Sequence, residues 1–538
     1  MTRYINTEGR YRCLICFAAV WAALMAVSVY FCTQKMGFHE DEYYTYYSTA
    51  RTNGFYVTDG QWTDRETYGK EFVVLPDQRF QYGFVKLVQS WDVHPPMYYW
   101  VFHTVASLVP NVFSKWIGLS VNLFFHGINI ILLWYLAYRI SGRDRTTAFL
   151  VTLFSGLSPA AMSGVVFIRM YEMLTTFILL CAVMHIRAAE EQGISWRFLV
   201  PMMAVTYIGF LTHYYYFIFL FYMGAAFVLW LLWRDRHIRN VVWYALSQGT
   251  ALVLAVLTYP SCLGQMFRGQ RGAQATENFF DISNTLGRIR FFGELIDRYV
   301  FGRLFWVLLL VIVLLAVAAG RGRQKRGTQG SAGYWILLFA GAGYFLTVAK
   351  TALLLGETSN RYQLPVYGII VLLAFAAVRT LWRRLMQTHA VQDGRVWAAG
   401  SLAALLGVAV MLSGAWREKV VFLYPEDSGQ TAFAKARAEE DTPVIYFYRT
   451  GEEWCVWAVT NELLAYPQVY LAAVDGEGVI DEERIRSAES MVVYIAGGAD
   501  DEKNLQRVLD SAPALADCER ECVFEEQYCN VYYLHREP

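Results

Sequence analysis

Long apolar runs constrain this chain more than any other feature of its sequence. Eleven runs have about the length that a helix needs to cross the hydrocarbon core of a bilayer. They are Cys13–Cys32, Trp116–Ile140, Thr147–Val166, Met170–Arg187, Arg197–Thr212, Tyr214–Trp233, Val241–Ser261, Leu304–Gly320, Tyr334–Leu355, Leu364–Trp382 and Trp397–Ala415. These runs predict an α-helical, multi-pass protein of the cell membrane with about eleven spans.

One further apolar segment decides which side of the membrane each loop faces. Met97–Val109 has only about 13 residues, so it is predicted to be a helix that lies at the membrane interface. With this segment at the interface, every basic cluster between spans falls on one side, as expected for cytoplasmic loops. The clusters are Arg139/Arg143/Arg145, Arg187, Arg234/Arg236/Arg239, Arg321/Arg323/Lys325/Arg326 and Arg383/Arg384. The N-terminus is therefore predicted to be cytoplasmic and the C-terminus extracytoplasmic.

The charge distribution divides the chain into two predicted domains. The whole chain has 46 basic and 46 acidic residues, which excludes a globally basic binder of nucleic acid. From Arg417 onward, however, 25 acidic residues stand against 11 basic ones. We therefore expect a transmembrane domain over residues 1–416, with a first outer loop at 35–96 and the interfacial helix at 97–109. Residues 417–538 are expected to form a soluble extracytoplasmic domain.

The acidic tail has a strand-and-helix pattern of its own. Four β-rich apolar runs alternate with polar stretches, which predicts a small α/β domain. The runs are Val444–Tyr448, Val469–Ala473, Met491–Ala496 and Asn530–Leu534. The tail also holds Cys455, Cys518, Cys522 and Cys529. We expect at least one disulfide among them on the extracytoplasmic side, with buried free thiols as the open alternative.

Three consecutive acids, Glu40-Asp41-Glu42, directly follow the first span and precede a stretch rich in tyrosine. A carboxylate at this depth is suited to act as a general base or a metal ligand at the lipid–water boundary. The alternative is an acid-rich start of an exposed helix, where carboxylates stabilise the free N–H groups.

A second polar group, Asp92-Val93-His94-Pro95-Pro96, precedes the interfacial helix. A proline disfavours the helical conformation in the residue before it but is tolerated in the first turn of a helix. We therefore expect Asp92 and His94 to lie in a turn just before the interfacial helix. Both residues are candidates for the reaction. The alternative is that Asp92 caps the helix and His94 is a structural turn residue.

Several other polar residues fall at the predicted outer ends of spans. Arg169, His213 and Arg361 lie there, with Lys350 as a weaker candidate within a turn or two of its span end. Tyr171 and Tyr362 flank the two arginines. Because basic residues otherwise gather on the cytoplasmic side, outer arginines are exceptions, and a phosphate is a natural partner for them. Anchoring of the helix ends at the interface is the alternative.

The sequence has no phosphate-binding loop, no Rossmann glycine fingerprint and no zinc-spaced Cys/His set. It also has no segment long enough to form a soluble cytoplasmic domain for a nucleotide-activated substrate. If the protein is an enzyme, its donor substrate is therefore expected to arrive through the membrane.

The order of these motifs resembles that of the polytopic GT-C glycosyltransferases, specifically the bacterial enzymes similar to protein O-mannosyltransferases. Asp41-Glu42 is similar to the acidic pair of their first outer loop, and Asp92-Val93-His94-Pro95-Pro96 is similar to their Asp-Val-His-Pro-Pro segment. The resemblance covers roughly Cys13 to Trp382 and leaves the acidic tail out. An additional acid, Glu40, departs from the pattern, so the base could be one position away from Asp41.

The resemblance implies transfer of a hexose from a dolichyl- or polyprenyl-phosphate sugar to an acceptor hydroxyl at the outer face of the membrane. Asp41 would be the general base, Glu42 would orient it, and Asp92 and His94 would complete the catalytic group. Substrate binding would fall to the outer-end residues Arg169, Tyr171, His213, Lys350, Arg361 and Tyr362. The resemblance leaves open which acceptor is used (protein, lipid or cell-wall glycan) and whether a divalent metal is required. A transporter or flippase of a lipid-linked glycan is the alternative function.

Overall fold

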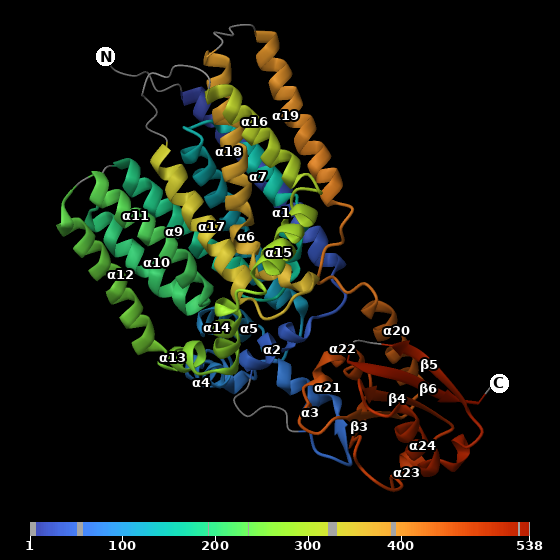
Figure 1. The fold of residues 1–538 in the computed structure, drawn as a ribbon. Coiled ribbons are helices and arrows are strands. Elements are labelled where there is room, and N and C mark those ends of the chain that lie inside the picture. The colour runs from blue at the N-terminus through green and yellow to red at the C-terminus, as the bar shows by residue number, and fades with distance from the viewer. Residues whose placement is uncertain are drawn as a thin grey trace. The chain divides into compact units, whose positions relative to one another are not determined.

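The computed structural model describes residues 7–50, 57–191, 193–234, 236–320, 331–388, 394–525 and 528–536. The packing of the chain divides it into two compact units (Figure 1). The helical unit comprises Met1–Thr33, Gln89–Val101 and Gly118–Val421. The sheet unit comprises Gln34–Val88, Phe102–Ile117 and Phe422–Pro538. Most of the first loop and the acidic tail therefore belong to the same unit.

The helical unit consists of apolar helices and a few shorter ones that join them. They are α1 (Thr7–Gln34), α6 (Lys115–Ile140), α7 (Arg145–Gly156), α8 (Pro159–Val166), α9 (Tyr171–Glu191), α10 (Trp196–Thr212), α11 (Tyr215–Arg234), α12 (Ile238–Thr258), α13 (Ser261–Phe267), α14 (Gln270–Phe280), α15 (Thr285–Tyr299), α16 (Phe305–Gly320), α17 (Ser331–Thr351), η3 (Glu357–Tyr362), α18 (Leu364–Thr388) and α19 (Gly394–Ala415). Each of the eleven predicted apolar runs corresponds to one of these helices or, for Thr147–Val166, to α7 and α8 together.

The lengths of these helices fit a membrane protein. Among the described residues, eight helices are long and apolar enough to cross a membrane, and α7 with α8 makes a ninth if the bent pair counts as one span. The helices α10 and α16 are apolar but shorter. The predicted helical, multi-pass fold is confirmed. The count of eleven spans and their direction stay predictions.

Ion pairs join loops that the sequence analysis places on the cytoplasmic side. Asp144, between α6 and α7, pairs with Arg379 at 3.0 Å and with Arg383 at 3.4 Å, both on α18. Arg139 Nε donates to Glu190 of α9 at 2.7 Å. These contacts join the end of α6, the start of α7, the end of α9 and the second half of α18. The predicted cytoplasmic cluster Arg321/Arg323/Lys325/Arg326 lies outside the described residues.

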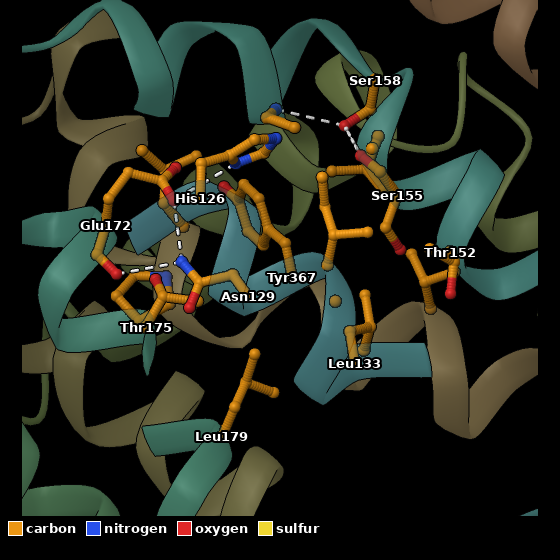
Figure 2. A pocket seen from close by; sticks show the side chains of 18 residues that line it. His126, Asn129, Leu133, Thr152, Ser155, Ser158, Glu172, Thr175, Leu179 and Tyr367 are labelled. Carbon is orange, nitrogen blue, oxygen red and sulfur yellow. Dashed lines mark hydrogen bonds and ion pairs between the residues drawn. The ribbon is translucent and has the colours of Figure 1, made fainter. Parts of the chain in front are cut away.

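A sharp bend of 59° separates α7 from α8 inside an uninterrupted apolar run. Ser158 caps α8, because its side chain accepts a hydrogen bond from the Ala161 N–H. Pro159 follows at the first helical position, where the missing N–H costs nothing and the continuation of α7 is blocked. Ser155 and Ser158 therefore lie at a helix break between apolar neighbours (Figure 2).

The sheet unit is built on one six-stranded sheet with the order β1-β3-β2-β4-β6-β5. The strands are β1 (Gln61–Asp64), β2 (Val444–Tyr448), β3 (Gln468–Ala473), β4 (Ser490–Ala496), β5 (Glu519–Glu525) and β6 (Cys529–His535). Strands β3, β2 and β4 are parallel, whereas β1, β6 and β5 join antiparallel. The four predicted strand runs of the tail are confirmed. Strand β1 comes from the first loop and pairs with β3, with Asp64 opposite Gln468.

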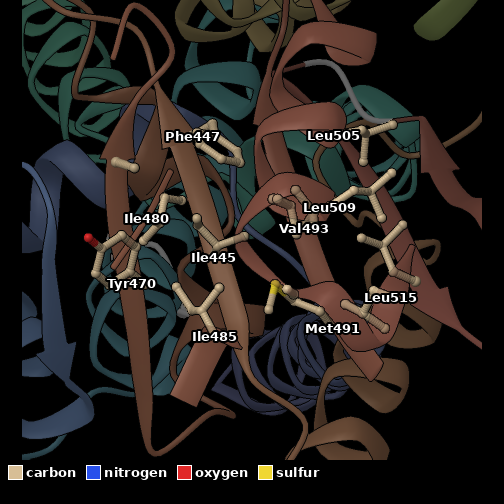
Figure 3. Packing of buried hydrophobic residues seen from close by; sticks show 14 of the residues in the cluster. Ile445, Phe447, Tyr470, Ile480, Ile485, Met491, Val493, Leu505, Leu509 and Leu515 are labelled. Carbon is tan, nitrogen blue, oxygen red and sulfur yellow. The ribbon is translucent and has the colours of Figure 1, made fainter. Parts of the chain in front are cut away.

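The core of the sheet unit explains why its central strands have continuous apolar sequences. Every residue of β2 is buried, as expected for a parallel strand that is covered on both sides. Ile445 of β2 and Val493 of β4 pack with Leu505 and Leu509 of α24 (Asp501–Ser511) on one face of the sheet (Figure 3).

Short helices complete the sheet unit. They are α2 (Glu40–Ala50), α3 (Arg65–Gly69), η1 (Lys70–Phe72), η2 (Pro76–Gln78), α20 (Asp427–Glu439), α21 (Cys455–Ala458), α22 (Thr460–Leu463), α23 (Glu483–Arg486) and η4 (Pro513–Leu515). Helices α4 (Tyr82–Trp91) and α5 (Met97–Leu108) contain residues of both units. The predicted helix over Met97–Val109 is thus present, and its position at the interface stays a prediction.

The structure, which describes all nine cysteines, has no disulfide between any of them, and this contradicts the expected disulfide in the tail. The strand register gives the reason. Cys522 lies opposite Tyr532, and Cys529 lies opposite Ala496, so neither has a cysteine as its cross-strand partner. Cys455 is buried at the start of α21. The alternative of buried thiols without a disulfide fits Cys455 and Cys529, whereas Cys518 is half-buried and Cys522 is exposed.

Candidate active site

Within the helical unit, the structure brings the predicted turn residues to the predicted outer-end residues. Nδ1 of His94 lies 3.2 Å from Asp92 Oδ2 and 3.3 Å from Arg169 Nη2. The ring of His94 lies 5.7 Å from the ring of His213, which lies 5.7 Å from the ring of Tyr171. Five candidates that are up to about 120 residues apart in sequence therefore form one group.

The turn that carries Asp92 and His94 is held by a glutamine that sequence analysis did not single out. Gln265 of α13 donates through Nε2 to the carbonyl oxygens of Gln89, at 2.9 Å, and Asp92, at 2.6 Å. Tyr259 donates to the Gln89 carbonyl at 2.6 Å. Tyr214 in turn donates to Oε1 of Gln265. The bond to the Asp92 carbonyl takes the place of the helical bond that Pro96, which has no N–H, cannot supply.

Arg169 is positioned by the short segment between α8 and α9. Asn122 of α6 donates through Nδ2 to the carbonyl oxygens of Val165, at 3.0 Å, and Phe167, at 2.6 Å, which fixes the path of this segment. The guanidinium of Arg169 lies 5.9 Å from the centre of the Tyr99 ring, within cation–π distance. Arg169 is only 3% exposed.

Arg361 and Tyr362 extend the group along its aromatic side. The Arg361 guanidinium lies 5.5 Å from the Phe167 ring and 5.2 Å from the Tyr362 ring, and the residue is 4% exposed. The Tyr362 ring lies 6.4 Å from that of Tyr171 and 6.0 Å from that of Tyr215. Phe167 and Tyr215 were not among the predicted candidates, because apolar and aromatic residues in a span have no distinguishing sequence signal.

We call these residues the arginine–tyrosine cluster: Asp92, His94, Phe167, Arg169, Tyr171, His213, Tyr215, Arg361 and Tyr362. It combines two buried guanidinium groups, a carboxylate and several ring faces. Guanidinium groups bind phosphate oxygens through paired N–H donors, and aromatic faces suit the apolar faces of sugars. The cluster is therefore chemically suited to a sugar phosphate.

The surroundings set the charge of the turn residues. Burial lowers the pKa of His94 below its usual value, and the positive charges of Arg169 and Arg271 lower it further. Burial alone would raise the pKa of Asp92, but the hydrogen bond to His94 and the nearby positive charges outweigh it and leave that pKa below its usual value. At neutral pH, His94 is thus neutral and Asp92 is ionised.

Lys350 is held by a different segment. Its Nζ donates to the Asp281 carbonyl at 2.6 Å, to Thr285 Oγ1 at 2.9 Å and to Asn284 Oδ1. These three bonds use the three N–H donors of the ammonium group to fix the turn between α14 and α15.

The three acids of the first loop lie in the sheet unit, at the start of α2, and each has a different environment. Glu42 is fully buried and pairs with the equally buried Lys35, with 2.9 Å between Oε2 and Nζ. The same Oε2 accepts from the His39 N–H at 2.6 Å, which closes the first turn of α2. Lys35 also donates to the Phe422 carbonyl at 2.7 Å. Glu42 is thus a structural anchor of the helix start.

Asp41 and Glu40 differ from this buried acid. The Asp41 side chain is 17% exposed, and its Oδ2 lies 3.6 Å from His39 Nδ1. Glu40 is hydrogen-bonded to Tyr528, whose pKa is raised by burial and by that bond. Asp41 has the imidazole of His39 as a neighbour, and Asp41 and Glu40 are both half-buried, whereas Glu42 is fully buried.

The two groups of candidates belong to different units, with Asp41 and Glu42 in the sheet unit and the arginine–tyrosine cluster in the helical unit. Within the described part of the chain, no group of three or more His, Cys, Asp and Glu side chains has a geometry that could hold a metal ion.

Comparison with known proteins agrees with this fold. The family model described as dolichyl-phosphate-mannose-protein mannosyltransferase matches residues 93–259, a stretch that contains His94, Arg169, Tyr171 and His213. The resemblance to the GT-C type of polyprenyl-phosphate-dependent membrane glycosyltransferases is confirmed. No curated protein sequence matches the chain.

Among solved structures, the chain is similar to ArnT from Cupriavidus metallidurans bound to undecaprenyl phosphate. The identity is 14%, the TM-score is 0.52, and the match covers 97% of each chain. The oligosaccharyltransferase AglB from Archaeoglobus fulgidus, in complex with an inhibitory peptide and a dolichol phosphate, matches at 11% identity and a TM-score of 0.43. That match covers 92% of this chain and 71% of AglB. The likeness to ArnT shows a shared fold over nearly the whole length.

Proposed function

We propose that this protein transfers a hexose from a polyprenyl-phosphate sugar to an acceptor hydroxyl at the outer face of the membrane. The observation that carries the proposal is the pair of buried arginines, Arg169 and Arg361, set among tyrosines in one cluster. Guanidinium groups bind phosphate oxygens through paired N–H donors, and the phosphate of a lipid-linked donor lies at the depth of the lipid headgroups.

The donor class is supported from two sides. The matching family model names a dolichyl-phosphate-mannose donor, and ArnT, which shares the fold, was solved with undecaprenyl phosphate. Arg169 and Arg361 would bind the phosphate, while Tyr171 and Tyr362 would line the binding site of the sugar. His213 would close the cluster beside His94. A phosphate that leaves as an anion is stabilised most where donors are already oriented toward it.

For the chemical step we propose Asp41 as the general base. The acceptor oxygen bonds to the anomeric carbon, its proton passes to the Asp41 carboxylate, and the bond from that carbon to the phosphate oxygen breaks with its electron pair. The polyprenyl phosphate leaves with the negative charge. Asp41 is preferred to Glu42 because the Glu42 carboxylate already forms a buried ion pair with Lys35, which gives it a structural role. Glu42 would act by fixing the turn that carries Asp41.

The remaining candidates would act on the donor side. Asp92 would keep His94 oriented by accepting a hydrogen bond from its Nδ1–H, and Nε2 of neutral His94 would accept a hydrogen bond from a sugar hydroxyl. We also propose that residues 417–538 and the rest of the sheet unit are extracytoplasmic and that the acceptor binds on that side. Whether the acceptor is protein, lipid or glycan is read from the product of the assay below.

A turnover assay with purified protein and a radiolabelled polyprenyl-phosphate hexose tests the proposal. We expect the label to leave the lipid and to appear in a product that is extracted with water or with the acceptor. Movement of the intact lipid across a vesicle membrane, without cleavage, would instead establish a transporter.

Arg361 and Arg384 give this assay a matched pair of arginine variants. Arg361→Ala should weaken donor affinity about 10- to 100-fold, because one charge-assisted contact to phosphate is worth about 1.5–3 kcal/mol. Arg384→Ala, near the other end of α18, should leave donor affinity unchanged. Equal effects of the two changes would mean that arginine only anchors the helix, and the phosphate role would be withdrawn.

A further inference from the structure

A cavity inside the helical unit is left unused by the proposed reaction. Its walls come from α6, α7, α8, α9 and α18, and it encloses about 680 Å³ of non-atom space, part of it open to the outside. The bend between α7 and α8 lies at its edge, with Ser155 in the last turn of α7 and Ser158 at the cap of α8 (Figure 2).

One wall of this cavity is polar and built from fixed side chains. Asn129 of α6 donates through Nδ2 to Glu172 Oε2 at 2.8 Å and to the Glu172 carbonyl at 3.0 Å. His126, one turn earlier on α6, places Nδ1 3.3 Å from the same Oε2. Thr176 donates to Asn129 Oδ1 at 2.6 Å, so the amide of Asn129 has one orientation. These hydrogen bonds hold the side chains of the polar wall in fixed positions.

Two polar atoms of the lining have no hydrogen-bond partner among the residues that the structure describes. They are Nε2 of His126, a residue only 5% exposed, and Oγ of Ser155 on α7. An unsatisfied buried polar group costs about 1–3 kcal/mol, so such atoms indicate a missing partner. Both belong to the same cavity, and they come from different helices.

The lining also defines the polarity of that partner. Leu133 and Leu179 lie in the lower part of the cavity, away from the polar wall (Figure 2). No lysine or arginine is among the described residues that line it, and the carboxylate of Glu172 disfavours a second negative charge. A phosphate is therefore a poor ligand here, which separates this cavity from the donor-binding cluster.

The depth of the polar wall narrows the choice further. His126 lies near the middle of α6, roughly 16 Å along the helix from its start at Lys115. A ligand at that depth must tolerate the hydrocarbon core and still offer a hydrogen-bonding group. A hydroxyl can both donate and accept, so it satisfies His126 Nε2 in either protonation state of the ring and Ser155 Oγ as well.

We propose that this cavity binds a neutral long-chain alcohol of the membrane, with its hydroxyl between His126 and Ser155 and its chain along Leu133 and Leu179. The site is independent of the proposed sugar transfer. Its ligand is distinguished from the sugar donor by the absence of charge.

Photolabelling of the full-length protein in lipid nanodiscs tests this site. The probe is hexadecanol with a diazirine in its chain. We expect saturable labelling of peptides that contain His126–Leu133 or Ser155–Ser158. Unlabelled hexadecanol should compete, whereas hexadecane and hexadecyl phosphate at the same concentration should not.

Two variants and a control complete the test. His126→Phe and Ser155→Ala should each weaken probe binding about three- to tenfold, since each removes one hydrogen bond. Ser401→Ala, an exposed hydroxyl on α19, should have no effect. Because His126→Phe leaves Glu172 without its neighbour and can impair folding, Ser155→Ala is the decisive variant.

Three results would overturn the proposal. Equal competition by hexadecane would mean a purely apolar crevice. Stronger competition by hexadecyl phosphate would mean an anionic lipid site. The absence of saturable labelling would mean that water alone fills the cavity.

Discussion

At the scale of single residues, the start of α2 separates three neighbouring acids by their partners. Glu42 is fixed by Lys35, Glu40 by Tyr528, and Asp41 lies beside His39 with part of its carboxylate accessible. Substitutions of the first two acids therefore change structure, whereas substitution of Asp41 is expected to change chemistry.

We predict that Asp41→Asn slows sugar transfer about 10²–10⁴-fold while the melting temperature stays close to that of the parent protein. Asparagine keeps the size and a hydrogen-bond acceptor but cannot take a proton from the acceptor. Turnover and thermal unfolding of the same purified sample provide the measurement.

Glu42→Gln is the matched control for Asp41→Asn. It leaves the buried Lys35 ammonium without its counter-charge, so we expect a loss of stability of about 3–5 kcal/mol. If Asp41→Asn turns over at the parental rate, the base is not Asp41. If Glu42→Gln is as stable as the parent, the ion pair does not anchor the helix.

Asp427, at the start of α20, gives the sheet unit a pH dependence. Burial and the negative charge of Glu426 raise the pKa of Asp427 to about 7. The positive charge of Lys35 lowers this pKa, but by less than the other two effects raise it. In the unfolded chain an aspartate titrates near about 3.9, so between these values the folded protein holds a proton that the unfolded chain has lost. This contribution to stability is complete below about pH 4 and is lost as the pH rises through about 7.

Asp427→Asn imitates the protonated form at every pH. We expect the variant to have a higher melting temperature than the parent at pH 8 and nearly the same one at pH 4.5. Thermal unfolding at both values checks this, and an equal difference at both would show that Asp427 does not titrate in this range.

At the scale of elements, α13 illustrates how a short helix outside the apolar runs controls the candidate site. Gln265 holds the turn with Asp92 and His94 through two carbonyl oxygens, without itself being part of the cluster. It is a positioning residue, because it acts only through the backbone of that turn.

We predict that Gln265→Leu lowers kcat about 10- to 100-fold, since small displacements of reacting groups are costly, and changes KM for the donor less than twofold. The pH profile of turnover should also shift, because His94 loses its fixed distance to Asp92. Steady-state kinetics across pH measure both effects. A normal kcat with a lowered melting temperature would indicate a role in stability alone.

The elements also show what sequence reasoning could reach. Apolar runs predict spans because a helix that crosses the bilayer must be apolar over a fixed length. Each predicted run does correspond to a helix, or in one case to a bent pair of helices. The bend after α7 was missed because the run continues through it, although Pro159 marks the place. Strands β1 and β5 were missed because they are edge strands with largely exposed residues and no apolar run.

The candidate site was predictable in the same uneven way. Outer-end position and motif order identified Arg169, His213 and Arg361, which the fold gathers into one cluster. The partners of the three acids were not predictable, because Lys35 and Tyr528 are distinguished only by three-dimensional contacts. The same holds for Gln265, a polar residue in a polar loop.

At the scale of the whole molecule, the direction of the chain in the membrane is the prediction with the widest consequences. The loops joined by Asp144, Arg379 and Arg383 are expected to be cytoplasmic, and the sheet unit is expected to be outside. A reporter that is active only outside the cytoplasm, fused after Pro538, should be active, and one fused in place of residues 389–393 should not. The reverse result would overturn both the orientation and the role of Asp41.

Strand β1 has a consequence for the time course of synthesis. Asp64 pairs with Gln468, about 400 residues later in the chain. At about 5–20 residues per second, roughly 20–80 seconds pass between the emergence of β1 and that of its partner β3. For that interval the first loop presents an unpaired strand edge, which can pair with other chains. A helper protein that shields this edge, or slow translation that prolongs the wait, should therefore alter the yield of the protein without touching its final structure.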